Sequence, residues 1–266
     1  MNDKSNSGLP SEPSPRSVGA EKLWISLRRL TPARIGLKRC GASLATAPLL
    51  DFQLAHARAR DAVHEPLNIR RLTSDLAALA LPVVDLISEA ENHQHYLMRP
   101  DLGRRLAPAA QAALARHAGA YDVAFVIADG LSARAVQLHA QPTLAGVLPD
   151  LRAERWRIAP LVVVRHGRVA VGDVIATILG AACVVVLIGE RPGLSAPDSM
   201  GAYLTWQLQP QTNDAQRNCI SNIRPEGIGY PEAAFKLAHL LRAMRAQQRS
   251  GVQLKDDSDQ LLVQQG

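Results

Sequence analysis

Residues 182–188 read ACVVVLI, residues 122–128 read DVAFVIA and residues 158–164 read IAPLVVV. Each stretch is a short, almost unbroken apolar run, and segments with the apolar spacing of helices lie between them. This alternation is typical of buried strands in a parallel sheet that helices cover on both faces. We therefore predict an α/β fold in which residues 121–251 form a Rossmann-like domain, with a fourth strand at 201–208.

The region before this domain has a different pattern. Apolar residues recur every three or four positions from Thr46 to Val63, which predicts a helix, and further helices are expected over 72–79, 89–98 and 100–114. Residues 83–87 fit either a short strand or a loop. We thus expect a smaller, mostly helical domain over residues 23–120. Residues 1–22, rich in Ser, Pro and Asn, are predicted to be a disordered tail, and residues 252–266 a polar, frayed tail.

Composition excludes several classes of protein. The chain has 266 residues, of which 47% are hydrophobic, so global disorder is excluded. Its longest apolar run, Ala181–Gly189, is much shorter than the roughly 20 residues that span a bilayer, and we expect no membrane partner. The three cysteines are far apart and give neither a disulfide framework nor a zinc spacing. This usage predicts a cytoplasmic location.

Positive charge is concentrated near the N-terminus. Residues 16–71 hold eleven Arg or Lys against four Asp or Glu, while the whole chain carries a net charge of +6. A basic segment of this kind can bind nucleic acid. Aromatic residues make up only 4% of the chain, however, and are not interleaved with the basic ones as stacking platforms require. We expect a solvated or subunit-facing basic surface and no nucleic-acid partner.

Three loops are candidates for a binding site. In an open α/β sheet, ligands bind at the carboxyl ends of the strands. Residues 129–132 (DGLS), 165–169 (RHGRV) and 189–194 (GERPGL) follow the three predicted strands, and each combines glycine with polar side chains. The chain has no G-x-G-x-x-G after Ala128 and no phosphate-binding P-loop. Ser132 fits a helix N-cap better than a nucleophile.

The histidines and cysteines give weaker signals. His93 and His95 form H-x-H, but a helix turns such a pair some 200° apart, so we interpret both as surface residues and predict no metal site. Cys183 lies within an apolar strand and is expected to pack in the core. Cys219 lies in a polar segment, 217–222 (RNCISN), where a site role and a packing role are both open.

Five segments together resemble a known family. They are, in chain order, SEA at 88–90, YLMRPDLGRRL at 96–106, DGLS at 129–132, GERPGL at 189–194 and NCISNI at 218–223. Their sequence, order and spacing are similar to those of the small (light) subunit of ethanolamine ammonia-lyase, from about Leu30 to Gly251. The stretches RPDLGRRL, GERPGL and CISNI are specific in combination.

This resemblance implies a function. Ethanolamine ammonia-lyase uses adenosylcobalamin to convert ethanolamine to acetaldehyde and ammonia by radical chemistry. Its large subunit is a TIM barrel that holds the substrate, and the small subunit covers the cobalamin at the interface of a hetero-oligomer. The family's cobalamin contacts match Val169, Glu190 and Cys219. The resemblance implies neither catalytic nor metal-ligating residues on this chain.

Cobalt is expected to keep the cofactor's own dimethylbenzimidazole as its ligand (base-on). A protein histidine that displaces this base usually lies in a D-x-H-x-x-G frame, and none of the eight histidines does so here.

Two departures from the family and two alternatives remain. Asn92-His93 stands where members of the family carry an acidic–basic pair, which removes a local ion pair. The N-terminal tail lacks the amphipathic helix that targets such enzymes to a bacterial microcompartment, so encapsulation is left open beside the cytoplasmic prediction. The first alternative is an independent Rossmann-like module that binds a nucleotide or small molecule. The second is a purely structural subunit without a cofactor contact.

Overall fold

The computed structural model describes residues 15–207 and 212–265. It separates into two compact units, Met1–Ala55 and His56–Gly266, and each is described by itself. The described part of the first unit holds a helix, a two-stranded antiparallel ribbon and the beginning of a second helix. Their bounds are α1 (Pro15–Arg28), β1 (Arg39–Cys40), β2 (Ser43–Leu44) and α2 (Thr46–His64), which continues into the second unit.

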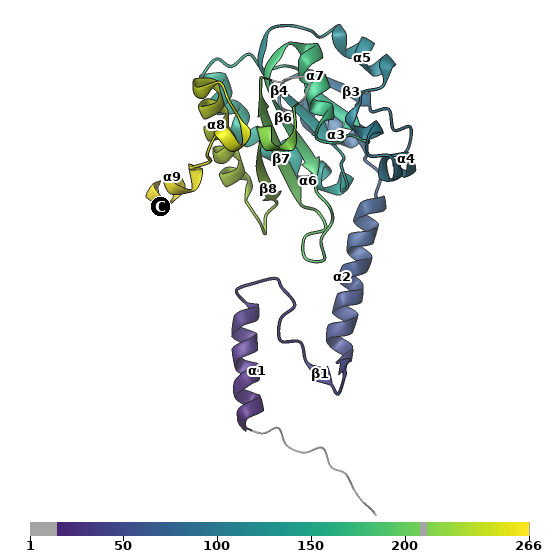
Figure 1. Ribbon diagram of the computed structural model, residues 1–266, viewed down its shortest axis with the longest axis vertical. Coiled ribbons are helices and arrows are strands. Elements are labelled where there is room, and N and C mark those ends of the chain that lie inside the picture. Colours follow the sequence, from purple (N-terminus) through teal and green to yellow (C-terminus); the bar gives the residue numbers. More distant parts are fainter. Residues whose placement is uncertain (1–14, 208–211, 266) are drawn as a thin grey trace, which may run out of the picture. The chain divides into compact units, whose positions relative to one another are not determined.

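The second unit is built on a six-stranded mixed sheet with the strand order β3-β5-β4-β6-β7-β8 (Figure 1). The first four strands are mutually parallel, and β7 and β8 each run antiparallel to the strand before them. The strands are β3 (Val83–Ile87), β4 (Tyr121–Ala128), β5 (Leu161–Arg165), β6 (Ala181–Gly189), β7 (Met200–Trp206) and β8 (Arg217–Ile223).

The α/β class is confirmed, but the prediction of a wholly parallel sheet is wrong for β7 and β8. Parallel neighbours need a crossover connection, usually a helix, whereas residues 190–199 between β6 and β7 contain none. The chain therefore turns back on itself there. Of the two alternatives left open for residues 83–87, the short strand is confirmed, and this strand, β3, is the edge of the sheet, which therefore begins before residue 121.

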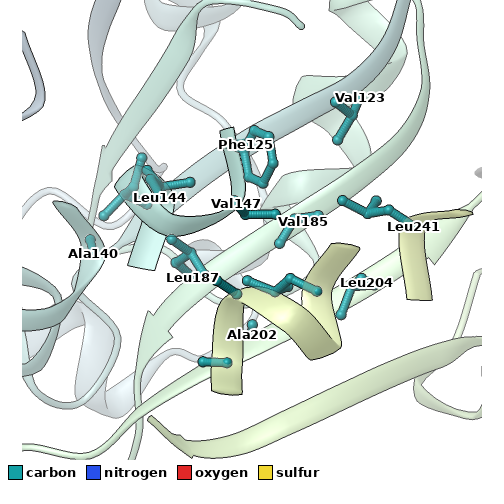
Figure 2. Packing of buried hydrophobic residues seen from close by; sticks show 14 of the residues in the cluster. Val123, Phe125, Ala140, Leu144, Val147, Val185, Leu187, Ala202, Leu204 and Leu241 are labelled. Atoms are coloured by element: carbon teal, nitrogen blue, oxygen red, sulfur yellow. The ribbon is translucent and has the colours of Figure 1, made fainter. Parts of the chain in front are cut away.

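Helices cover both faces of the sheet. The core on one face contains residues of α3 (Ile69–Ala77), α6 (Ala133–Ala153) and α8 (Tyr230–Gln247), and the core on the other contains residues of α5 (Pro108–Ala115) and α7 (Val171–Leu179). Figure 2 shows the first of these cores, where Phe125, Val185 and Leu204 of the sheet lie among Leu144 of α6 and Leu241 of α8. Both faces of the central strands are buried, which explains their unbroken apolar sequences.

Helix boundaries follow local chemistry. Ser132 is the N-cap of α6, as predicted, and its hydroxyl oxygen accepts a hydrogen bond from the N–H of Ala135. Gly180 ends α7 in the left-handed region, with φ of 71°, which glycine adopts without strain. The single helix predicted over 100–114 is replaced by a 3₁₀ turn, Leu102–Arg104, followed by α5. Before these lies the short helix α4 (His93–Met98).

Both predicted tails contain helix. Residues 1–14 of the predicted tail lie outside the described residues, and α1 begins at Pro15. At the other end, a 3₁₀ turn (Gly251–Gln253) and α9 (Ser258–Gln265) follow the last core helix. Ser258 is buried, and its Oγ accepts a hydrogen bond from Nζ of Lys236 at 3.3 Å. None of the described helices combines the length and hydrophobicity that crossing a membrane needs.

Candidate functional site

Asp129 joins the loops that follow the neighbouring strands β4 and β5. Its carboxylate accepts hydrogen bonds from three backbone N–H groups, those of Gly130 at 3.0 Å, His166 at 2.9 Å and Gly167 at 3.1 Å. The side chain is buried, and this burial raises the pKa of Asp129 to about 6 against the opposing effect of the three hydrogen bonds. The β4–α6 loop and the β5–α7 loop are therefore fixed to each other by one carboxylate.

The segment around Gly103 packs on the β5–α7 loop. The carbonyl of Gly103 accepts the N–H of Arg168 at 2.7 Å, and the Arg168 guanidinium lies 4.2 Å from the centre of the buried Tyr96 ring. A Cβ at Gly103 would lie only 3.0 Å from the carbonyl oxygen of His166. The stretch YLMRPDLGRRL thus supports the loop from which Val169 leads into α7. Val169 itself is half-buried and packs against the α7 side of the sheet.

Glu190 follows β6 and binds the neighbouring strands. Its carboxylate accepts hydrogen bonds from the hydroxyl of Ser199, the hydroxyl of Ser221 at 2.5 Å and the N–H of Asn222 at 3.2 Å. No ion pair in the described part of the chain involves Glu190. The side chain therefore connects the carboxyl end of β6 to the end of β8.

Cys219 lies on β8 directly across from Tyr203 of β7. It is exposed, whereas Cys183 on β6 is fully buried, as predicted. Desolvation by the surrounding strands raises the pKa of the Cys219 thiol, and a hydrogen bond with the Tyr203 hydroxyl opposes this shift. Burial also raises the pKa of Tyr203. Both groups are therefore protonated at neutral pH, and the thiol is not an activated nucleophile.

Of the three residues singled out by the resemblance, Glu190 and Cys219 lie at β8, and Val169 packs on the α7 face of the sheet. Val169 and Tyr203 pack against the same hydrophobic core, Tyr203 lies opposite Cys219, and Glu190 contacts the strand that carries Cys219. β8 was not expected from the sequence RNCISNI, because its buried residues, Arg217, Ile220 and Ile223, recur every three positions and not every two. The polar residues of this segment indicate a loop when the segment is considered without its partner strand.

A buried ion pair holds α7 against this surface. The guanidinium of Arg217 on β8 donates to both carboxylate oxygens of Asp173 in the first turn of α7, at 2.7 and 2.6 Å. Beyond this pair, the β8 residues on the same face, Cys219 and Ser221, are exposed. The structure thus leaves the α7 side of β7 and β8 partly uncovered, with hydroxyl, thiol and carboxylate groups along it.

The site contains no arrangement for covalent or metal catalysis within the residues that the structure describes. Ser132 caps α6 and donates its own hydroxyl hydrogen to the carbonyl of Pro197 at 3.1 Å, so it is engaged structurally. Over residues 15–207 and 212–265, no three His, Cys, Asp or Glu side chains are placed to hold a metal ion. Fold and site together define an α/β protein with carboxylate, hydroxyl and thiol groups along one partly uncovered face of its sheet.

Comparison with known proteins identifies the family. The sequence pattern of the ethanolamine ammonia-lyase light chain matches residues 21–255. The small subunit of ethanolamine ammonia-lyase from Ralstonia nicotianae is 52% identical over 247 residues, covering 91% of this chain and 92% of that protein. The corresponding subunit from Azotobacter vinelandii is 52% identical over 250 residues (92% and 93%), and that from Pseudomonas aeruginosa is 49% identical over 263 residues (97% and 93%). This chain belongs to the ethanolamine ammonia-lyase light chain family.

Proposed function

We propose that this chain is the small subunit of an adenosylcobalamin-dependent ethanolamine ammonia-lyase, which converts ethanolamine to acetaldehyde and ammonia. The observation that carries the proposal is the family match over residues 21–255, together with about half-identity to small subunits along nearly their whole length. Its partner is the large subunit of the same enzyme, in a hetero-oligomer, rather than a nucleic acid. A cytoplasmic location is an expectation from the cysteine usage, and location within a bacterial microcompartment stays open.

The partly uncovered face of β7 and β8 fits a corrin. The rim of a corrin carries amide side chains, which need both donors and acceptors, and its ring needs a broad surface. Glu190 offers an acceptor, Ser221 and Tyr203 offer hydroxyl groups, and Val169 offers an apolar contact. When bound, adenosylcobalamin supplies the radical chemistry. The role of this chain is to hold the cofactor's rim and to exclude water from its side of the interface.

Three residues would carry the cofactor contacts. Val169 would pack on the ring or on its dimethylbenzimidazole, and Cys219 would lie against the corrin as a neutral thiol. Glu190 is already held by Ser199, Ser221 and Asn222, so its carboxylate is fixed in place before any corrin amide donates to it. Such preorganisation reduces the entropy cost of binding. No histidine of the chain lies in the D-x-H-x-x-G frame, which supports base-on binding.

Glu190→Gln tests the cofactor contact in the complex with the large subunit. Hydrogen bonds to a charged group contribute about 1.5–3 kcal/mol, so adenosylcobalamin affinity should fall about tenfold to a hundredfold. Turnover of ethanolamine to acetaldehyde at saturating cofactor should change less. Glu91→Gln is the control, because the Glu91 side chain is 82% exposed and its ion pair in the described part of the chain is with His95 of α4.

Two results would contradict these proposals. Unchanged cofactor affinity in E190Q, with a lowered melting temperature, would make Glu190 a purely structural residue. Ethanolamine turnover by this chain without the large subunit would contradict the proposal that the large subunit carries the catalytic reaction. An electron paramagnetic resonance spectrum of cob(II)alamin with nitrogen coupling from a protein histidine would exclude base-on binding.

A further inference from the structure

A second candidate site lies where the sheet connections diverge. β4 and β5 are neighbours, but the helix after β4, α6, packs on one face of the sheet, and the helix after β5, α7, packs on the other. The crevice outside the carboxyl ends of two such strands is where open α/β sheets bind ligands. In this chain a cavity of about 200 Å³ occupies that position. Its lining contains none of Val169, Glu190 and Cys219.

Nitrogen-bearing side chains converge on this cavity. His64 at the end of α2, His93 on α4, and Arg165 and His166 at the end of β5 all line it. The ring centres of His93 and His166 are 6.2 Å apart, and those of His64 and His93 are 6.1 Å apart. The interpretation of His93 as a surface residue is therefore wrong, because long-range packing brings it against the β5 loop.

Several of these nitrogens are buried without a partner. His93 Nε2, His166 Nδ1 and Arg165 Nε have no hydrogen-bond partner in the part of the chain that the structure describes. Native proteins rarely leave buried polar atoms unsatisfied, and a cluster of them beside a cavity indicates a ligand. Arg165 is also only loosely paired, since its Nε lies 3.4 Å from a carboxylate oxygen of Asp85.

The carboxylates in the wall are already engaged. Asp129 accepts three backbone N–H groups and faces His166 Nδ1 at 3.6 Å, and Glu65 lies 3.7 Å from the guanidinium of Arg134. The polar atoms left for a ligand are thus nitrogens that can donate. A cavity of this volume is smaller than the 300–1,000 Å³ typical of drug-sized ligands.

From this geometry we propose that the cavity between the β4 and β5 loops binds a small oxyanion, a carboxylate or a phosphate-like ion. His93, His166 and Arg165 are its donors. The site is independent of the cobalamin assignment, since neither its lining nor its ligand chemistry depends on that cofactor.

Binding should tighten as the pH falls. Burial lowers the pKa values of His93 and His166, so both rings are neutral at pH 7, and Arg165 adds to the lowering for His166. A bound anion stabilises the protonated rings and so raises their pKa values. The protein therefore takes up protons when the anion binds. Asp129, with a pKa of about 6, loses its negative charge over the same range and acts in the same direction. The other titratable or charged groups that line the cavity are His64, Glu65 and Arg165.

The test is calorimetric titration of the full-length chain with sulfate, whose charge is constant between pH 6 and pH 8, at fixed ionic strength. Affinity should be about tenfold higher at pH 6 than at pH 8. His93→Gln and His166→Gln should each weaken binding about tenfold or more, because each removes one charge-assisted donor. His95→Gln is the matched control, since His95 lies on the same helix outside the cavity.

Further measurements identify the class of ligand and keep the test valid if a variant misfolds. Inorganic phosphate and acetate are titrated beside sulfate: binding of sulfate and phosphate alone identifies a tetrahedral anion, and binding of acetate as well identifies a carboxylate site. Ring ¹⁵N spectra of the wild-type chain should show the pKa values of His93 and His166 rising with sulfate, even if a variant fails to fold. Absence of binding at about 10 mM anion, or affinity unchanged in both H93Q and H166Q, overturns the proposal.

Discussion

Asp129 is a buried acid that three backbone N–H groups solvate in place of water. Those hydrogen bonds favour its ionised form, while burial favours the protonated form and has the larger effect on the pKa. The residue therefore holds two loops in place at neutral pH at a cost in desolvation. Such a compromise is common where a fold needs a rigid loop arrangement beside a site.

Asp129→Asn should change how stability depends on pH. The pKa of Asp129 is about 6 in the folded chain, against about 3.9 for an unperturbed Asp. Between these values the folded state binds a proton that the unfolded state does not, so this group's contribution to the free energy of unfolding falls as the pH rises from about 4 to about 6. The stability of wild type relative to D129N should thus be greater at pH 4.5 than at pH 7.0, by roughly 2 kcal/mol.

Urea unfolding of both chains at the two pH values measures this difference. Comparing the two chains removes the titration of groups that they share. A stability difference that stays constant between pH 4.5 and pH 7.0 would show that Asp129 has an ordinary pKa in the folded chain.

Single residues were predictable where local chemistry decides their role. Ser132 precedes an apolar helical pattern, and Cys183 lies within an unbroken apolar strand, so a capping role and a buried role follow from their neighbours in sequence. His93 was not predictable, because its environment is made by His166, 73 positions further along the chain. Glu190 was placed correctly after its strand, but its hydroxyl partners Ser199 and Ser221 come from other elements.

At the scale of elements, the contact between α7 and β8 depends on one ion pair. The side chain of Arg217 is 2% exposed and bonds both oxygens of Asp173, and it also donates to the Thr205 hydroxyl at 2.9 Å. Its contact with Asp214 is different, since the Asp214 side chain is 98% exposed. Buried and exposed partners of the same guanidinium therefore offer a direct comparison.

Arg217→Met should destabilise the chain by about 3–5 kcal/mol, because it leaves the Asp173 carboxylate without its buried cation. Asp214→Asn should cost less than about 1 kcal/mol, as exposed pairs do. Adding Asp173→Leu to R217M should restore part of the loss, since the double change removes both charges. Chemical denaturation of the four chains gives these values. Equal losses in R217M and D214N would mean that the buried pair contributes no more than the exposed one.

The strands were predictable to the extent that their two faces are buried. β4, β5 and β6 lie in the middle of the sheet, and their apolar runs reveal them without any partner. β8 is an edge strand with an irregular register, and its buried residues recur every three positions, so its sequence lacks the alternation that marks a strand. The antiparallel direction of β7 was predictable from the sequence. Residues 190–199 contain Pro and Gly but no helical pattern. Without a crossover helix, a neighbouring strand must run antiparallel.

At the scale of the whole molecule, both hydrophobic cores belong to the second unit. Every residue of the two core clusters lies between Leu67 and Leu254. The first unit instead exposes large apolar side chains, among them Leu23 (58% exposed), Ile25 (45%), Leu30 (82%) and Leu50 (58%). The free energy that stabilises the sheet therefore arises without residues 1–45.

A chain that begins at Thr46 should accordingly keep its fold. It retains α2 whole, all strands of the six-stranded sheet and both cores, and the residues it loses from 15 to 45 belong to neither core. Because cooperative stability follows the apolar surface buried in the core, we expect the midpoint of thermal unfolding to lie within about 2–4 °C of the full-length value, the shift that roughly 1 kcal/mol causes in a chain of this size. Differential scanning calorimetry of the two chains gives the comparison, and R217M in the shortened chain is the positive control for a real loss of core stability. A fall of 10 °C or more, roughly three times that shift, would show that the first 45 residues contribute to the core after all.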